Sequence, residues 1–514
     1  MLNRSSGSPL NLESLSPMAG KTTSAGLQDC LVVVLGPLAI YAFMAALVGS
    51  LVDGDTGWHL AAGRWIIAHA GVPRSDPFSY SFANAPWTAH EWLSEVLMYA
   101  TWRAGGWGGL LLLFASAAAT TFAILAVHVR RWLTPAATAL MLVYTAIALT
   151  PFLLARPHML ALPILTGWLV ILLRSREAGR VPPLPAALLM LLWANLHGGF
   201  VLGLGLAGAF GLEALIEAPH GKRRDVVMRW GLFGLTALIA SLFTPSGVEG
   251  LVFPFRVASL KLLSGIAEWM PSDFATLQEF EICLLTALFF CLFKPVRVPA
   301  IRLLVLLLLL HMALQHMRQQ AILVVVAALL LAEPLARAYA PQRDMPRQSL
   351  RLVLRNARGE FVPFFLVTLA LFAGLGAWRL LNPMDRSDSR GVPVTALRHL
   401  PPQLRDRRVF NEYSFGGLLI LQGIKVFIDG RADMYGDPFT LDYIKMTNDG
   451  DIDRWRTADR KWRFDWVILP PGSKLLAAIA REPGWRRIYA DKWAVILERA
   501  AAPALVRPIR GGDR

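Results

Sequence analysis

The sequence predicts a polytopic α-helical membrane protein with a small α/β domain after its last span. Composition is the first reason, because 55% of the 514 residues are hydrophobic, only 17% are charged and the mean hydropathy is +0.47. Soluble domains average about 25% charged residues. Apolar runs of membrane-spanning length recur between residues 30 and 378. From about residue 400 to 500, strand-like and helix-like segments alternate instead. These features exclude a disordered, a fibrous and a large-core soluble protein.

Eleven apolar runs are predicted to span the membrane. They divide the chain into a disordered cytoplasmic N-terminus (1–29), a transmembrane region (30–379) and a periplasmic α/β domain with its tail (380–514). The run that begins at Cys30 is too long for a signal-peptide core, so it is interpreted as an uncleaved first span. The predicted spans are 30–52, 108–128, 135–154, 158–173, 183–196, 199–217, 230–245, 278–293, 303–317, 320–336 and 361–378.

The basic residues set the predicted orientation. The formal net charge is +15, from 51 Lys+Arg and 36 Asp+Glu. If the N-terminus lies inside, every inside loop carries Lys or Arg, as the positive-inside rule expects. An odd number of spans then places the C-terminal domain outside. The positive charge therefore indicates contact with membrane lipids and no nucleic-acid partner.

The C-terminal domain is predicted from five segments. Strands are expected at "RRVFNEY" (407–413), "IKVFIDG" (424–430) and "FDWVILP" (464–470), and a helix at "SKLLAAIARE" (473–482). The segment "WRRIYADKWAVILER" predicts a hairpin with Ala490 and Asp491 near its turn. The three cysteines all fall in predicted spans, so no disulfide is expected in this domain.

The first outer loop, residues 53–107, is the most informative part of the chain. Its segment "TGWHLAAGRWIIAH" predicts a helix that lies in the membrane interface and ends at Gly71. "VPRSDPFSY" predicts a turn, and "TAHEWLSEVLMYATWR" predicts a second amphipathic helix. "GGWGG" is expected to break that helix before the second span.

Asp53 and Asp55 stand where the first span leaves the bilayer. A carboxylate there could take a proton from an acceptor hydroxyl. A carboxylate pair could also hold a divalent cation against a phosphate leaving group. The alternative is structural, because Asp55 occupies an expected helix N-cap position, where Asp is favoured, and Asp53 could be a boundary residue. Residue spacing leaves both interpretations open.

Other polar residues are predicted on the same side of the membrane, where ionisable groups are functional candidates. Arginine is suited to a lipid phosphate, and histidines could join carboxylates around a metal. The alternatives are an arginine that reaches toward lipid headgroups and a histidine packed in the protein. The candidates for substrate or phosphate binding are Arg156, His158, Asn195, His197, Glu268 and Arg318, and those for metal binding are Asp53, Asp55, His59 and Glu91.

In the C-terminal domain, Asp429 and Asp433 flank Arg431 in "FIDGRADMYGD", just after an expected strand. A strand end is a common place for a site. An Asp–Gly turn followed by an Arg–Asp ion pair is the favoured interpretation. Asn411 and Glu412 in "FNEYSFGG" are interpreted in the same way.

Five strings carry a resemblance: "DGDTGWHLAAGRWI", "GVPRSDPFSY", "HEWLSEVLMY", "WANLHGGF" and "VFIDGRADMYG". With the long first outer loop, they resemble a group of bacterial membrane proteins described as glycosyltransferase-like, within the GT-C superfamily of polyprenyl-phosphate-sugar-dependent enzymes. This resemblance covers most of the chain after residue 30. In that superfamily an acidic residue of the first outer loop acts as base or metal ligand, a role that maps onto Asp53 or Asp55.

The resemblance implies a GT-C-like fold and a hexosyl- or pentosyltransferase in a bacterial inner membrane. Such an enzyme would move a sugar from a polyprenyl-phosphate carrier to an envelope glycan, lipid or protein on the periplasmic face. A divalent metal ion is an open expectation, because some superfamily members need none. Two alternatives remain: a transporter or flippase, and a non-catalytic scaffold for envelope polysaccharide assembly. No pair of inverted repeats supports the first of these.

Overall fold

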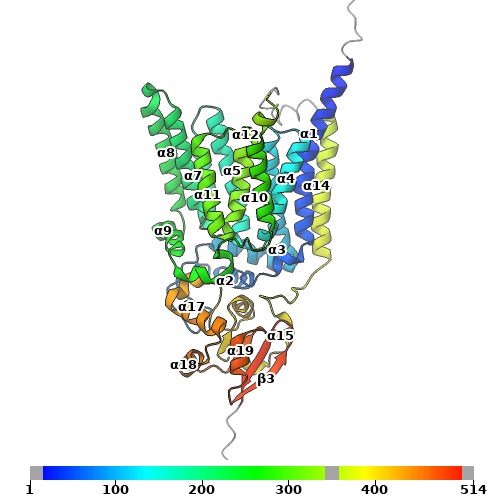
Figure 1. Ribbon diagram of the computed structural model, residues 1–514. Coiled ribbons are helices and arrows are strands. Elements are labelled where there is room, and N and C mark those ends of the chain that lie inside the picture. The colour runs from blue at the N-terminus through cyan, green and yellow to red at the C-terminus, as the bar shows by residue number, and fades with distance from the viewer. Residues whose placement is uncertain (1–15, 342–357, 501–514) are drawn as a thin grey trace, which may run out of the picture.

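A bundle of long helices forms one end of the molecule, and a small mixed domain forms the other (Figure 1). The computed structural model describes residues 16–341 and 358–500. Within them, seven helical segments are long and apolar enough to cross a membrane: Gln28–Ala46, Trp92–Val129, Pro135–Phe152, Pro157–Glu177, Phe200–Glu217, Met317–Tyr339 and Pro363–Leu381. The segments correspond to α1 (Ser16–Ala46), α3 (Trp92–Val129), α4 (Pro135–Leu149), α5 (Pro157–Glu177), α7 (Phe200–Glu217), α12 (Gln320–Tyr339) and α14 (Arg358–Leu381), and those of α4 and α12 each include an adjoining 3₁₀ turn.

The four other predicted spans also contain helices, which run alongside the seven in the bundle (Figure 1). They are α6 (Ala187–Leu196), α8 (Arg223–Ser241), α10 (Glu279–Phe293) and α11 (Ala300–Gln315). These helices are shorter or carry charged ends, so the full count of eleven spans stays a prediction, as does the orientation. Many large apolar side chains on α8, α10, α11 and α14 are exposed, among them Leu235, Leu285, Leu304 and Phe365. Such an apolar outer surface is what a lipid-facing bundle requires.

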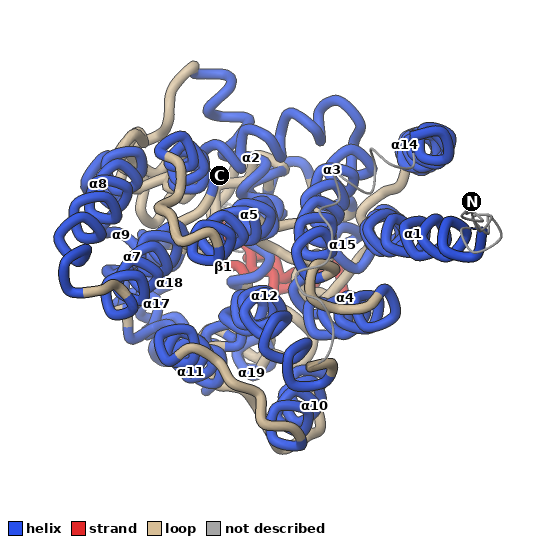
Figure 2. Tube along the Cα trace, turned by 90° about the horizontal axis from the view of Figure 1, so that it is seen from above, coloured by secondary structure: helices blue, strands red, loops and turns tan. Residues whose placement is uncertain are grey.

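The first helix begins earlier than the sequence predicts. α1 starts at Ser16, inside the segment 1–29 that was expected to be disordered, and residues 1–15 lie outside the described part of the chain. At its other end, α1 stops at Ala46, and the 3₁₀ turn η2 (Val48–Leu51) follows. In Figure 2, α1 and α14 lie side by side at one edge of the bundle.

Helices α3 and α5 pack against each other in the core of the bundle. Trp168 of α5 is fully buried and stacks on Phe233 of α8 with ring centroids 5.4 Å apart. Its indole Nε1 donates to the carbonyl oxygen of Gly203 on α7 at 2.8 Å. A side chain at Gly203 would collide with Trp193. Glycine therefore permits the close approach of α6 and α7, as small residues do between membrane helices.

The first outer loop has the two helices that the sequence predicts. α2 (Thr56–His69) ends with Ala70 in the left-handed conformation. The second predicted helix is the first part of α3, which has non-helical backbone at Gly105 and Gly106. The break therefore falls within "GGWGG", and Gly106, at φ 57°, adopts a conformation that favours glycine.

The C-terminal domain is built on a four-stranded sheet in the order β1-β2-β4-β3. β1 is parallel to β2, and the other neighbours are antiparallel. The predicted hairpin is β3–β4, and Asp491 accepts from the backbone N–H groups of Trp493 and Ala494 at 2.7 Å in its turn. The strands are β1 (Val409–Asn411), β2 (Trp466–Leu469), β3 (Trp485–Ala490) and β4 (Val495–Arg499), and the helices are α15 (Val394–Arg398), α16 (Gly416–Leu421), α17 (Ala432–Asp449), α18 (Ile452–Trp462) and α19 (Lys474–Ile479).

The prediction of a sheet strand at 424–430 is wrong. The segment is not part of the sheet and makes only an isolated bridge, from Val426 to Ser79 of the first outer loop. The backbone N–H of Tyr80 donates to the carbonyl oxygen of Val426 at 3.1 Å, and Val426 donates back to Phe78 at 3.3 Å. The buried side chain of Asn411 holds the other side, where it accepts from the N–H of Phe427 at 3.0 Å. An alternating pattern predicts extended backbone, but it does not identify the partner.

The C-terminal domain packs on one end of the bundle, which we call the domain end (Figure 1). α2 lies between the bundle and the domain, where it packs against α16. The other elements at this end are α9 (Gly247–Ala258) and the 3₁₀ turns η6 (Lys261–Gly265), η7 (Ala267–Trp269) and η8 (Met317–Gln319). The candidate site is formed here.

Candidate functional site

Arg156 brings together both aspartates of the first outer loop. Its guanidinium contacts Asp53 through Nε, and Nη2 donates to Asp53 Oδ1 at 2.9 Å. The same Nη2 donates to Asp55 Oδ2 at 2.7 Å. The side chains of Asp53 and Asp55 are 7% and 19% exposed, and that of Arg156 is 18% exposed. Pairing with a planar guanidinium is geometrically favourable for carboxylates that have lost most of their water.

Glu268 and Arg318 extend this network. Arg156 Nη1 also contacts Glu268, and Arg318 Nη1 lies 3.6 Å from Glu268 Oε1. Arg318 in addition lies over the ring of Trp269, 4.4 Å from its centroid. We call Asp53, Asp55, Arg156, Glu268 and Arg318 the carboxylate cluster. Its members come from four separate segments of the sequence.

Backbone contacts hold two of these segments in register. Ala155 N–H donates to the carbonyl oxygen of Ser50 at 2.9 Å. Thr56 Oγ1 donates to the carbonyl oxygen of Ala155 at 3.2 Å. Since Arg156 is the N-cap residue of α5, these bonds place its side chain directly beside the Asp53–Asp55 turn. The first turns of α2 and α5 and the hydrogen bonds at Ala155 therefore hold the aspartates and Arg156 next to each other.

Asp55 occupies the N-cap position of α2, but its side chain makes no capping hydrogen bond. The carboxylate points instead to Arg156. A capping Asp would accept from a backbone N–H within the first turn of the helix. The expectation that Asp55 caps the helix through its side chain is therefore wrong, because the carboxylate belongs to the carboxylate cluster.

The two aspartates differ in their acidity. For Asp53, burial acts to raise the pKa, but the charge and hydrogen bonds of Arg156 outweigh burial and hold the pKa below its usual value. For Asp55, burial raises the pKa to about 7, the Asp53 and Glu268 charges add to that effect, and Arg156 opposes it. Asp53 is therefore ionised at neutral pH, whereas Asp55 exchanges a proton near pH 7. In such a pair, Asp53 keeps its negative charge, and Asp55 can act as an acid or a base.

A second group of titratable residues lies around Glu91. His197 Nε2 is 3.4 Å from Glu91 Oε1, His90 Nε2 is 3.7 Å from the same oxygen, and His59 Nε2 is 3.9 Å from Oε2. Burial raises the pKa of Glu91 to about 7 and lowers the pKa of each histidine. The histidines are therefore neutral at pH 7. Of the residues predicted for a substrate site, His197 lies in this group and not in the carboxylate cluster.

Two predicted site residues have structural contacts. Asn195 accepts from the indole N–H of Trp92 at 2.8 Å and donates to the carbonyl oxygens of Leu191 and Phe243 at 2.8 and 2.9 Å. His158 Nε2 lies 3.1 Å from the carbonyl oxygen of Phe152. These bonds join helix ends, so the packed interpretation fits Asn195 and His158 best.

The residues predicted to hold a metal fall into the two groups. Asp53 and Asp55 are bound to Arg156, while His59 and Glu91 belong to the histidine group. Among residues 16–341 and 358–500, no set of three or more His, Cys, Asp or Glu side chains is placed to hold a metal ion. The guanidinium of Arg156 occupies the space between the carboxylates of Asp53 and Asp55. In this arrangement these two carboxylates do not fit a cation.

The C-terminal domain completes the site, which the sequence pattern did not reveal. Arg386 Nε donates to the carbonyl oxygen of Leu51 at 2.8 Å, and its Nη2 contacts the carbonyl oxygen of Asp53. A Cβ at Gly54 would overlap the carbonyl oxygen of Ser414, and one at Gly430 would overlap the carboxylate of Asp55. Glycines therefore allow the backbone of the domain to lie directly on the Asp53–Asp55 turn.

Arg431 fixes this contact. Its guanidinium, which is fully buried, binds Asp429 at 2.7 Å and Asp76 of the first outer loop at 2.6 Å. It also lies over the ring of Trp87, 4.8 Å from its centroid. The favoured interpretation of an Arg–Asp ion pair therefore describes Arg431 and Asp429, but the second partner is Asp76 and not Asp433. In the sequence, Asp76 could be recognised only as part of the predicted turn "RSDPFSY". In that turn its carboxylate accepts from the N–H groups of Phe78 and Ser79.

The fold and the site together define a polytopic helical membrane protein whose C-terminal domain closes over a buried charged cluster at one end of the bundle. The sequence matches no protein-family model and no curated protein. Among solved structures, an oligosaccharyltransferase from Archaeoglobus fulgidus, in its apo form, is similar at 12% identity with a TM-score of 0.48. The match covers 86% of this chain and 69% of that one.

Proposed function

We propose that this protein is a glycosyltransferase that moves a sugar from a polyprenyl-phosphate carrier to an envelope acceptor, with Asp55 as the general base. The observation that carries the proposal is the geometry of the carboxylate cluster, in which Arg156 holds Asp53 and Asp55 side by side at 2.9 and 2.7 Å. The pKa of Asp55, which burial raises to about 7, supports the assignment. A general base works best when its pKa lies near the working pH. The donor class comes from the sequence resemblance to GT-C enzymes.

The chemistry assigns a role to each member of the carboxylate cluster. Asp55 takes the proton of the acceptor hydroxyl, and the acceptor oxygen forms a bond to the anomeric carbon of the sugar. The bond from that carbon to the carrier phosphate oxygen breaks, and the phosphate keeps the electron pair. Asp53 stays ionised and, with Glu268, holds Arg156 in place.

Arg318 is the better of the two arginines for the leaving phosphate. Arg156 already contacts three carboxylates, whereas Arg318 has a single ion-pair partner at 3.6 Å and a side chain that is 31% exposed. A guanidinium that stacks on an aromatic ring keeps its donor fork in a fixed plane. Arg318 is therefore assigned to the phosphate, and Arg156 to positioning the carboxylates.

The scaffold alternative has one observation in its favour. Asp53, Asp55 and Glu268 are all paired with arginines, so the cluster could serve only to hold the first outer loop against α5. Buried ion-pair networks do occur as purely structural features. A functional assay has to separate the two.

The test uses the purified full chain and a labelled polyprenyl-phosphate sugar. An enzyme consumes this donor in detergent, whereas a transporter moves it only across sealed vesicles and a scaffold does neither. The double variant Asp53→Asn/Asp55→Asn should abolish transfer while the protein still folds, because Arg156 keeps Glu268 as a charged partner and both asparagines can accept from it. Transfer that survives in the variant would exclude the base assignment. A parallel reaction with EDTA tests whether a divalent cation replaces Arg156 between the carboxylates, because only in that case does transfer stop.

A further inference from the structure

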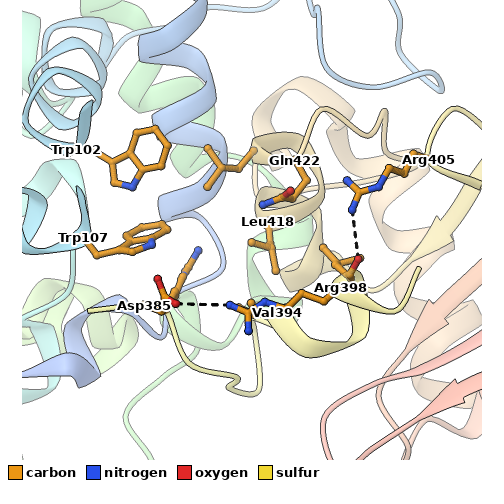
Figure 3. Close-up of a pocket in the computed structure, with 11 residues that line it drawn as sticks. Trp102, Trp107, Asp385, Val394, Arg398, Arg405, Leu418 and Gln422 are labelled. Atoms are coloured by element: carbon orange, nitrogen blue, oxygen red, sulfur yellow. Dashed lines mark hydrogen bonds and ion pairs between the residues drawn. The ribbon is translucent and has the colours of Figure 1, made fainter. Parts of the chain in front are cut away.

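A pocket of about 250 Å³ lies between the bundle and the C-terminal domain, and Arg386, which lines it, contacts the carbonyl oxygen of Asp53. Trp102 and Trp107 of α3 line one side (Figure 3). The domain contributes Asp385, Arg386, Arg398 and Arg405. The proposed transfer reaction uses none of these side chains to touch the substrate.

Two buried donors in this pocket lack a hydrogen-bond partner within the part of the chain that the structure describes. They are Arg386 Nη1 and Trp102 Nε1. Arg386 is only 5% exposed, and its other two nitrogens are bound to backbone carbonyls of Leu51 and Asp53. An unsatisfied buried donor is unfavourable, and a buried charged one is more so. The two donors therefore indicate a ligand that accepts hydrogen bonds.

The charge of the pocket indicates an anion. The lining includes three arginines but a single carboxylate, that of Asp385. This carboxylate is 88% exposed and lies 3.8 Å from Arg398. Burial lowers the pKa of Arg386 to about 10, although the charges of Asp53 and Asp55 act to raise it. An anion bound at Nη1 would restore the stabilisation that this guanidinium has lost with its water.

The pocket lies beside the end of an apolar helix that is long enough to span a membrane. Trp102 and Trp107 flank the Gly105–Gly106 break in α3. The sequence predicts an interfacial helix before this break and a span after it. A Cβ at Gly105 would touch Leu380, at the end of the last apolar helix, and Arg386 follows only a few residues later. Tryptophans at this level are typical of the membrane–water interface.

We propose that this pocket binds the phosphate of an anionic phospholipid from the surrounding bilayer, through Arg386 Nη1, Trp102 Nε1, Arg398 and Arg405. The proposal goes beyond the proposed transfer reaction and does not depend on it. Arg386 holds the carbonyl oxygens of Leu51 and Asp53 with its remaining nitrogens. The bound lipid therefore connects the membrane surface to the backbone of the Asp53–Asp55 turn.

The experiment measures bound phospholipid on the full chain by native mass spectrometry in mild detergent. The protein is offered phosphatidylglycerol, diacylglycerol or inorganic phosphate. Wild type should retain phosphatidylglycerol and not diacylglycerol. The variant Arg398→Gln/Arg405→Gln should lose binding by at least about tenfold, and Trp102→Phe, which keeps a ring but removes the donor, by a smaller factor. Arg481→Gln/Arg487→Gln makes the same charge change at exposed sites and should bind like wild type.

Three outcomes would overturn the proposal. The first is equal lipid retention in the pocket variant and in the exposed-site control. The second is equal retention of diacylglycerol, which would mean that acyl chains and not phosphate are recognised. The third is displacement of the lipid by an equal concentration of inorganic phosphate, which would make the pocket a site for a free anion. Each is independent of sugar transfer, so failure of the transfer assay alone leaves the lipid proposal standing.

Discussion

Arg156 donates from Nη2 to Asp55 Oδ2 at 2.7 Å, across 101 positions of the sequence. This bond joins the first outer loop to the start of α5, and Glu268 contacts the same guanidinium from η7. Three carboxylates thus depend on one arginine. That dependence gives the cluster a distinctive response to mutation and to pH.

Replacement of Arg156 by Gln should destabilise the protein in a pH-dependent way. The variant leaves three carboxylates without their main counter-ion, and loss of one partner of a buried pair costs about 3–5 kcal/mol. Because the pKa of Asp55 is already about 7, acidification neutralises the uncompensated charge. Thermal unfolding in detergent should therefore show a large decrease in Tm at about pH 8 and a smaller one at about pH 5. A decrease that is the same at both pH values would contradict this assignment.

The rate of sugar transfer should rise with pH to a plateau, with its midpoint near the Asp55 pKa of about 7. Only the ionised carboxylate can accept the proton, so the rate should fall by about tenfold per pH unit below the midpoint. Initial rates with subsaturating donor measure this profile. A rate that stays flat from about pH 5.5 to 8.5 would mean that no group with a pKa near neutrality controls the reaction.

Replacement of Arg431 by Met should loosen the C-terminal domain from the first outer loop. Asp76 and Asp429 would stay buried without their counter-ion, at a cost of about 3–5 kcal/mol. Limited proteolysis between α14 and α15 should become faster, and the cleaved domain should dissociate more readily. Arg481→Met, at an exposed position of the same domain, is the control. Equal cleavage rates would show that Arg431 does not fix the contact.

A methyl group at Gly417 should separate the domain from the site without altering a charge. A Cβ there would overlap the carbonyl oxygen of Gly54, whereas one at Gly472 has no neighbour within 4 Å. Overpacking of this kind costs about 1–3 kcal/mol. Gly417→Ala should therefore reduce transfer and increase protease sensitivity, and Gly472→Ala should do neither. Identical behaviour of the two variants would show that the contact between the C-terminal domain and the Asp53–Asp55 turn is not needed for transfer.

Local sequence features predicted the parts of the fold that depend on local chemistry. The break at Gly105–Gly106 followed from glycine, and the β3–β4 hairpin from its alternating pattern and its turn at Asp491. The segment 424–430 was predicted as a strand, but Val426 makes only an isolated bridge with the first outer loop, more than 300 positions away. A single sequence contains no signal for such a partner.

The site divides in the same way. Asp53 and Asp55 could be selected because they sit at the end of an apolar run, where charge is scarce. Their joint attachment to Arg156 could not be predicted, since three separate segments meet there. Nothing in the sequence marked Arg386 as a site residue, because its contact with Leu51 depends on how the C-terminal domain lies on the bundle. Asn195 looked similar to the site residues in sequence, but its contacts join helix ends.

The most direct test of the assignment of Asp55 is the transfer rate of the single variant Asp55→Asn, compared with wild type at saturating labelled donor. Asparagine has nearly the same shape and can still accept from Arg156, but it cannot take a proton at neutral pH. We expect the rate to fall by about 10²–10⁴ while the Tm and the yield of folded protein remain close to wild type. A variant that folds normally and transfers sugar at the wild-type rate would show that Asp55 is not the base.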